Sequence, residues 1–196
     1  MNESYNTSCS ITDNSLASKE TESNSILSNN SENQFQISES LKNQIINAIT
    51  ANLKEIIEEN KQNIGEKYSS HDIFYLQVIP KISLEDYIKR LFKYTKISIS
   101  TLIISIIYLD KFCEKYNYVL SFNNVYRLLL ISTFISMKFN EDFVVTTNIY
   151  SKIAGVTIAD LNFLEYKMCS ALDFRFNVEF DYYQQYFKYF SKFIPK

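Results

Sequence analysis

The sequence predicts an all-α protein. After residue 40, apolar residues recur every three or four positions in one segment after another, which is the spacing of amphipathic helices. Two of these segments begin with Ser or Thr followed three residues later by Asp, which is a helix-start signal. The two glycines and two prolines lie outside the helix interiors, and the alternating patterns and turn signals of a β-rich protein are absent. A chain of 196 residues that is 46% hydrophobic can bury one sizeable core.

The first 37 residues are expected to form a disordered tail. Residues 1–40 contain eleven serines, seven asparagines and six acidic residues against one lysine. Such a segment cannot bury enough apolar surface to offset the entropy of ordering it. The acids of this tail account for the formal charge of −2, so the remainder of the chain is only slightly basic.

An amphipathic helix over residues 38–64 is expected next, flanking the main domain. Leu41, Ile45, Ile49 and Leu53 recur every four residues, with Lys and Glu between them. The pattern stops near Gly65.

The main domain is predicted over residues 80–178 and comprises five helices. The first begins at Ser83, where Ser83 and Asp86 have capping-box spacing, and the fifth begins with the same signal at Thr157 and Asp160. The segments that carry the helical pattern are 83–94, 98–116, 121–139, 147–155 and 157–172. The second is apolar on nearly every face, as expected for a helix surrounded by others. Its uncharged stretch of 13 residues is shorter than the roughly 20 that a bilayer requires, so no membrane span is expected.

A C-terminal helix rich in aromatic residues is predicted over residues 179–196, where "FDYYQQYFKYF" places rings at helical spacing. Packing onto the core is favoured over a separate binding groove, because no polar groups converge there in the sequence.

No catalytic, metal-binding or cofactor-binding pattern is present. The only histidine, His71, has no nucleophile or ligand set at a recognisable spacing. Gly65 and Gly155 stand alone, so no phosphate-binding loop is predicted. Adjacent acids such as Glu141 and Asp142 are interpreted as helix-end and surface charges. We therefore expect no enzyme activity from this chain.

The cysteines and the charge suggest where the protein works. Cys9, Cys113 and Cys169 are widely spaced and odd in number, which suits free thiols in an intracellular compartment, the nucleus or the cytoplasm or both. The slight basic excess after residue 40 disfavours nucleic-acid binding.

A series of motifs resembles the cyclin box of the P-type (U-type) cyclins. The motifs are "PKISLEDYIKRLFKY", "YLDKF", "NNVYRLLLISTFISMKFNED", "NIYSKIAGV" and "LNFLEYKMCSALDFRFNV", in the family's order between Pro80 and about Phe190. The resemblance implies a five-helix cyclin box and a regulatory subunit that binds and activates a cyclin-dependent kinase. The chain departs from the family at Tyr126, Phe143 and Ala154, where histidine, tyrosine and glycine are usual.

The resemblance also implies a kinase-binding face. Lys138 and Glu165 match the charged pair of that face in cyclins. Its apolar contacts would be Ile135, Phe139, Cys169, Phe174 and Phe176. The alternative for Lys138 and Glu165 is an intramolecular surface pair worth roughly 0–1 kcal/mol, and the two roles are compatible.

A buried salt bridge is also expected. Asp110 matches an aspartate that forms a buried salt bridge in cyclins, and Arg90 is the available partner.

The alternative function is a cyclin-fold scaffold that binds a non-kinase partner without activating it. The sequence does not identify the kinase, its substrates, the cell-cycle phase or any phosphorylation of the tail.

Overall fold

The computed structural model describes residues 39–61 and 72–192, and every regular element in these ranges is helical, which confirms the predicted fold class. The predicted tail and His71 lie outside the described residues. One helix covers residues 39–60. It is followed by α2 (Leu84–Thr95), α3 (Ile99–Tyr116), α4 (Val125–Asn140), α5 (Thr147–Ala154), α6 (Ile158–Ala171) and α7 (Phe180–Ser191).

The centre of the bundle is the packing of α3 against α4, the most extensive contact between two labelled helices. Every residue of α4 from Leu128 to Met137 is buried. Small hydroxyl residues allow these two helices to approach closely: Ser136 and Ser105 have no exposed surface, and Ser136 Oγ donates to the carbonyl of Thr101 at 2.7 Å.

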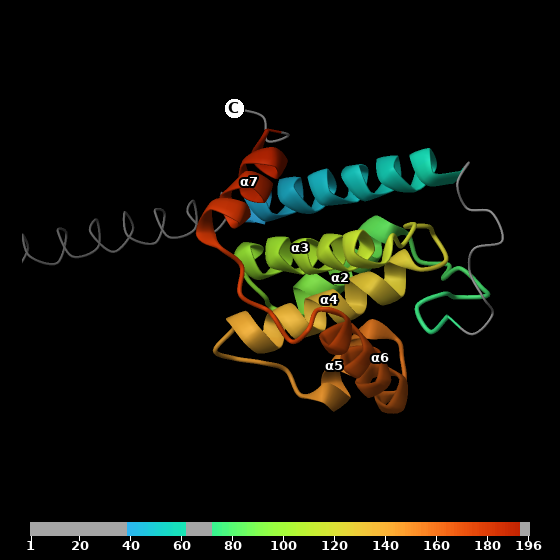
Figure 1. Cartoon of the computed structure of the whole chain (residues 1–196). Coiled ribbons are helices and arrows are strands. Elements are labelled where there is room, and N and C mark those ends of the chain that lie inside the picture. The colour runs from blue at the N-terminus through green and yellow to red at the C-terminus, as the bar shows by residue number, and fades with distance from the viewer. Residues whose placement is uncertain (1–38, 62–71, 193–196) are drawn as a thin grey trace, which may run out of the picture. The chain divides into compact units, whose positions relative to one another are not determined.

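The other helices cover this pair from opposite sides (Figure 1). The 39–60 helix and α7 lie on one side, and α5 and α6 lie on the other. The 39–60 helix buries the predicted stripe of Ile45, Ile49 and Leu53. Tyr150 of α5 is completely buried and donates to the Leu130 carbonyl of α4 at 2.6 Å.

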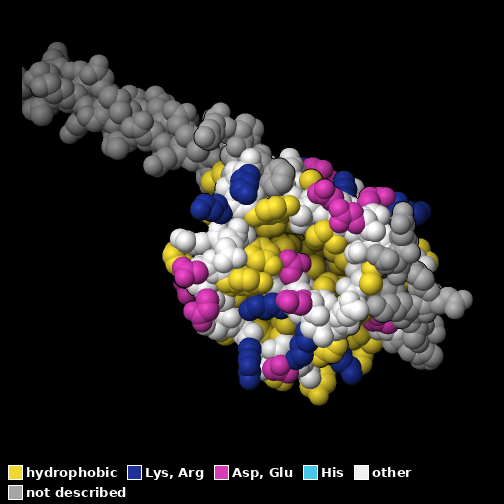
Figure 2. Space-filling view, turned by 45° about the horizontal axis from the view of Figure 1, so that its top comes forward, with side chains coloured by type: hydrophobic (Ala, Val, Ile, Leu, Met, Phe, Trp, Pro, Cys, Tyr) yellow, Lys and Arg dark blue, Asp and Glu magenta, His cyan; other side chains and the backbone are white. Residues whose placement is uncertain are grey.

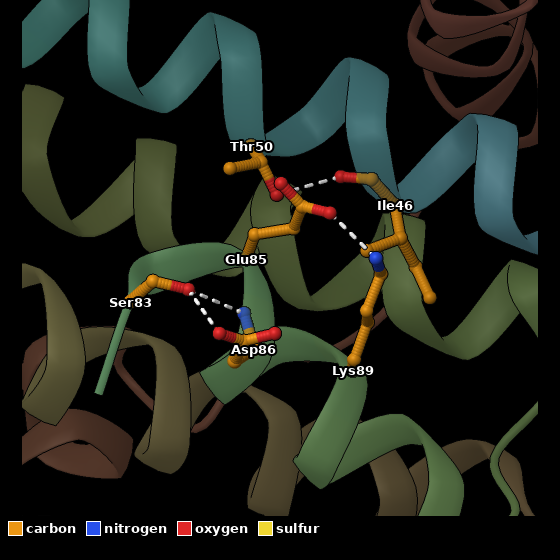
Figure 3. A network of polar contacts seen from close by, with 6 residues as sticks. All are labelled: Ile46, Thr50, Ser83, Glu85, Asp86 and Lys89. Carbon is orange, nitrogen blue, oxygen red and sulfur yellow. Dashed lines mark hydrogen bonds and ion pairs between the residues drawn. The ribbon is translucent and has the colours of Figure 1, made fainter.

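Side-chain caps fix where the helices begin. Ser83 Oγ accepts from the backbone N–H of Asp86 at 3.0 Å, and its hydroxyl donates to the Asp86 carboxylate at 2.7 Å (Figure 3). The same exchange joins Thr157 and Asp160 before α6. Each cap satisfies an N–H that has no partner within its helix, so both predicted helix starts are confirmed.

One helix starts later than its pattern predicts. The segment that carries the helical pattern begins at Ser121, whereas α4 begins at Val125. The Asn124 side chain explains the difference, because it accepts from the Ser121 N–H at 2.8 Å and donates to the Val119 carbonyl at 2.9 Å, which holds residues 119–124 in a turn. Within the described part of the chain, no helix is both long and apolar enough to cross a membrane.

Candidate functional site

Lys138 and Glu165 form an ion pair between the end of α4 and the middle of α6. Lys138 Nζ lies 2.5 Å from Glu165 Oε1, with the two side chains 46% and 22% exposed. The lysine ammonium also lies 5.1 Å from the centroid of the Phe134 ring. The predicted intramolecular pair therefore exists, and it stands at the surface where a second protein can reach it.

Aromatic side chains border this pair. Phe139 is 56% exposed, and its ring centroid lies 5.6 Å from that of the half-buried Phe176. Phe174 is 62% exposed. We call Lys138, Phe139, Glu165, Phe174 and Phe176 the α4–α6 patch.

Backbone geometry after α6 turns Phe174 outward. Asp173 and Phe174 both have left-handed backbones, with φ of 53° and 54°. The Phe174 N–H donates to the Cys169 carbonyl at 2.9 Å, and Lys115 of α3 pairs with Asp173 at 2.6 Å. A positive φ costs a phenylalanine roughly 1–2 kcal/mol, and such strain concentrates at functional positions.

Two residues predicted as contacts of this face lie beneath it. Ile135 is 3% exposed and Cys169 is 9% exposed. Burial, and next the Glu165 carboxylate, raises the pKa of the Cys169 thiol, while Lys138 lowers it. Both side chains therefore support the α4–α6 patch from within and offer a partner little area.

Glu141 ties the end of α4 to the start of α3. Its Oε1 accepts from the Ser98 backbone N–H at 2.7 Å and from the Thr101 hydroxyl at 2.5 Å. Burial works to raise the pKa of this carboxyl, but the hydrogen bonds from Thr101 and Ser98 outweigh it and lower the pKa. The predicted helix-end role of Glu141 is thus realised on a helix other than its own.

Comparison with known proteins decides the family. The cyclin family model matches residues 7–176. The chain belongs to the cyclin family. It is similar to Cyclin-U4-2 of Arabidopsis thaliana (32% identity, over 71% of this chain and 68% of that protein) and to Cyclin-U4-1 of the same plant (28%, over 78% and 77%). Cyclin-P3-1 of Oryza sativa subsp. japonica is 26% identical over 76% of this chain and 66% of that protein. These relatives confirm the P-type (U-type) resemblance.

The expected buried pair is not formed in this cyclin. Across residues 39–61 and 72–192, Arg90 and Asp110 make no ion pair with each other. Arg90 Nε donates instead to the Ile153 carbonyl at 2.8 Å, at the end of α5, where helix carbonyls lack intrahelical partners. Asp110 Oδ2 accepts from the Tyr186 hydroxyl at 2.9 Å. Arg90 therefore joins α2 to α5, whereas Asp110 joins α3 to α7.

The aromatic helix α7 contributes to the core mainly through Phe190, which is 2% exposed. Tyr183 donates to Ser100 Oγ at 3.1 Å and Tyr186 to Asp110, so α7 is also fixed to α3 by hydroxyl groups. The sequence favours packing of this helix onto the core, and Phe190 packs there. The sequence did not reveal that Asp110 brings a polar group to this helix.

A cavity of about 590 Å³ lies among residues 76–82, α2, the start of α4 and the α5–α6 turn. The rings of Tyr87 and Tyr126 meet in its wall, with centroids 5.3 Å apart. The two arginines in its lining both donate hydrogen bonds to backbone carbonyls. Arg90 donates to the carbonyl of Ile153 at the end of α5, and Arg127 donates to that of Ile73. No local motif announces this cavity, because four separate segments line it.

Proposed function

We propose that this cyclin is the regulatory subunit of a cyclin-dependent protein kinase, which it binds and activates through the α4–α6 patch. The observation that carries the proposal is the Lys138–Glu165 pair flanked by the exposed rings of Phe139 and Phe174. Aromatic anchors supply area that loses water on docking, and charges at their edge fix the register of the partner.

The proposed mechanism is conformational. The α4–α6 patch docks on the small lobe of the kinase and holds its C-helix so that the glutamate of that helix pairs with the nucleotide-binding lysine, as an active kinase requires. Moving a kinase from about 1% to about 99% active takes a preference of roughly 5.5 kcal/mol for the active state. A surface pair worth roughly 0–1 kcal/mol cannot supply that, so the apolar contacts must supply most of it.

A charge exchange tests the role of the pair. Lys138→Glu combined with Glu165→Lys keeps two opposite charges in contact within the cyclin and reverses the charge that each position presents to a partner. We expect each single variant and the double variant to lose kinase binding, while the double variant keeps the helicity and melting temperature of the parent. If the double variant recovered binding, the pair would act only within the cyclin, and its proposed contact with the kinase would be wrong.

A kinase assay tests activation separately. The chain is used to capture cyclin-dependent kinase catalytic subunits from its own organism, and phosphorylation of a general substrate is measured with and without the purified cyclin. We expect stimulation that depends on the α4–α6 patch. Stable capture without stimulation would identify a scaffold and contradict the proposed activation.

A further inference from the structure

A hollow of about 270 Å³ lies among the 39–60 helix, α3 and α7. Figure 2 looks onto this side of the molecule and shows hydrophobic side chains around a hollow, with an acidic side chain in it. Its lining residues are Asn52, Ile56, Asp110, Gln185, Tyr186, Tyr189 and Phe190. This volume is slightly below the roughly 300–1,000 Å³ of pockets that enclose a whole small molecule, so the hollow suits a single side chain better.

Only one of the two carboxylate oxygens of Asp110 has a hydrogen-bond partner among the described residues. Oδ2 accepts from the Tyr186 hydroxyl, and no described residue bonds to Oδ1. Within the described ranges no lysine or arginine pairs with Asp110, and the neighbouring Lys111 ammonium lies over the Tyr182 ring instead. Burial raises the pKa of Asp110, the bond from Tyr186 opposes the rise, and Glu114 adds to it. A cation in the hollow would relieve this cost.

The walls suit a cation carried on an apolar stem. The lining includes the aromatic side chains of Tyr186, Tyr189 and Phe190 together with the aliphatic Ile56. Aromatic faces attract ammonium and guanidinium groups, most strongly where water is excluded, and the hydrocarbon stems of Lys and Arg pack on apolar surface.

The surroundings favour a cation that a protein presents. Tyr189, which lines the hollow on α7, remains 39% exposed. Aromatic side chains are enriched at the centre of protein interfaces, and a charge pair across an interface fixes the register of the partner.

We propose that this hollow binds a lysine or arginine side chain of a partner protein, with Asp110 as the counter-ion and the α7 rings as the walls. The site involves neither α4 nor α6. It is therefore independent of the kinase-binding proposal and gives this cyclin a second docking point.

Peptide titration tests the proposal. The full chain, with ¹³C in its tyrosine rings, is titrated by NMR with capped Gly-Gly-Arg-Gly-Gly and Gly-Gly-Lys-Gly-Gly, with the norleucine peptide as the neutral control. We expect the ring signals of Tyr186 and Tyr189 to shift with the cationic peptides and not with norleucine. No shift at millimolar peptide overturns the proposal. A response to free butylammonium without one to the peptides also overturns it, since the site would then be one for a small amine.

Two matched variants assign the charge. Asp110→Asn keeps an acceptor for the Tyr186 hydroxyl and removes the negative charge, so we expect peptide affinity to fall at least tenfold with the fold intact. Asp142→Asn makes the same substitution at an exposed position after α4 that does not line the hollow, and it should leave the affinity within twofold. Equal affinity for Asp110→Asn and the parent overturns the proposal.

Discussion

Replacing Phe174 with glycine separates binding from folding. Phe174 combines 62% exposure with a φ of 54°, a backbone that glycine adopts without strain. The substitution removes the most exposed aromatic ring of the α4–α6 patch and at the same time relieves the strain that holds it there.

The expected changes follow from area and backbone strain. A phenylalanine side chain offers about 200 Å². Under the proposed function, docking therefore buries about 120 Å² of Phe174, worth about 3 kcal/mol or a little over 100-fold in affinity. In the free cyclin the substitution loses about 2 kcal/mol of packing from the buried remainder. Relief of the left-handed backbone returns about 1–2 kcal/mol, and the flexibility of glycine in the unfolded chain takes back about 0.5–1 kcal/mol. We therefore expect stability to fall by only about 1 kcal/mol.

Titration calorimetry with the kinase catalytic subunit and urea unfolding of the free cyclin measure the two quantities. Phe163→Ala is the matched control, because Phe163 is 49% exposed on α6 but lies two residues from Glu165 and so faces another way. It should leave the affinity unchanged. Unchanged affinity for Phe174→Gly would remove Phe174 from the interface. A loss of stability of about 3 kcal/mol or more would show that its main role is in the fold.

Two further outcomes concern Glu141 and Cys113. Glu141→Gln should cost about 1 kcal/mol at neutral pH, because neutral hydrogen bonds replace charge-assisted ones to Ser98 and Thr101. The folded pKa of Glu141 is lowered, so this contribution to stability is complete above the unfolded pKa and is lost as the pH falls through the folded pKa. The melting temperatures of the variant and the parent should therefore converge in acid. A difference in melting temperature that stays constant with pH would contradict this reasoning. Burial, and then the Asp110 carboxylate, raises the pKa of the Cys113 thiol to about 12. Because the thiolate is the reactive form, iodoacetamide should label Cys113 far more slowly in the folded chain than in urea, and peptide mass spectrometry measures the difference.

Local signals in the sequence identify most of the helices. Ser83 and Thr157 mark two helix starts through hydroxyls that act within three residues, and Gly155 marks the end of α5 with a φ of 74°. The late start of α4 depends on Asn124 bonding to residues on its N-terminal side. An apolar period does not report such a contact, so the pattern places this start too early.

The site is less accessible to sequence reasoning because it depends on which distant groups meet. Resemblance identified Lys138 and Glu165 as a pair, and the structure brings them together. The resemblance also paired Arg90 with Asp110. In the structure the Arg90 guanidinium instead donates to the carbonyls of Ile153 and Lys152, which lack intrahelical partners at the end of α5. The strained backbone at Phe174 has no signal in its residue type, since phenylalanine is among the last residues that a positive φ would suggest.

The α4–α6 patch is held in place by the core of the free cyclin. On one side of Phe174, Asp173 pairs with Lys115; on the other, the Phe176 carbonyl accepts from the fully buried Tyr108 at 2.6 Å. Both contacts lead to α3, so the segment that carries Phe174 is fixed before any partner arrives. Preorganisation of this kind lowers the entropy lost on docking.

A rigid patch determines which partner changes shape. Under the proposed function, the exposed parts of Phe139 and Phe174 together provide about 6 kcal/mol of gross apolar burial, and they activate the kinase to the extent that these contacts form with its active state and not with its inactive one. Because the cyclin side is already fixed, little of this free energy goes into ordering the cyclin, and the kinase is the partner whose conformational equilibrium shifts. The Lys138–Glu165 pair is then left to select the register of docking, which is why reversing its charges should abolish recognition without unfolding the protein.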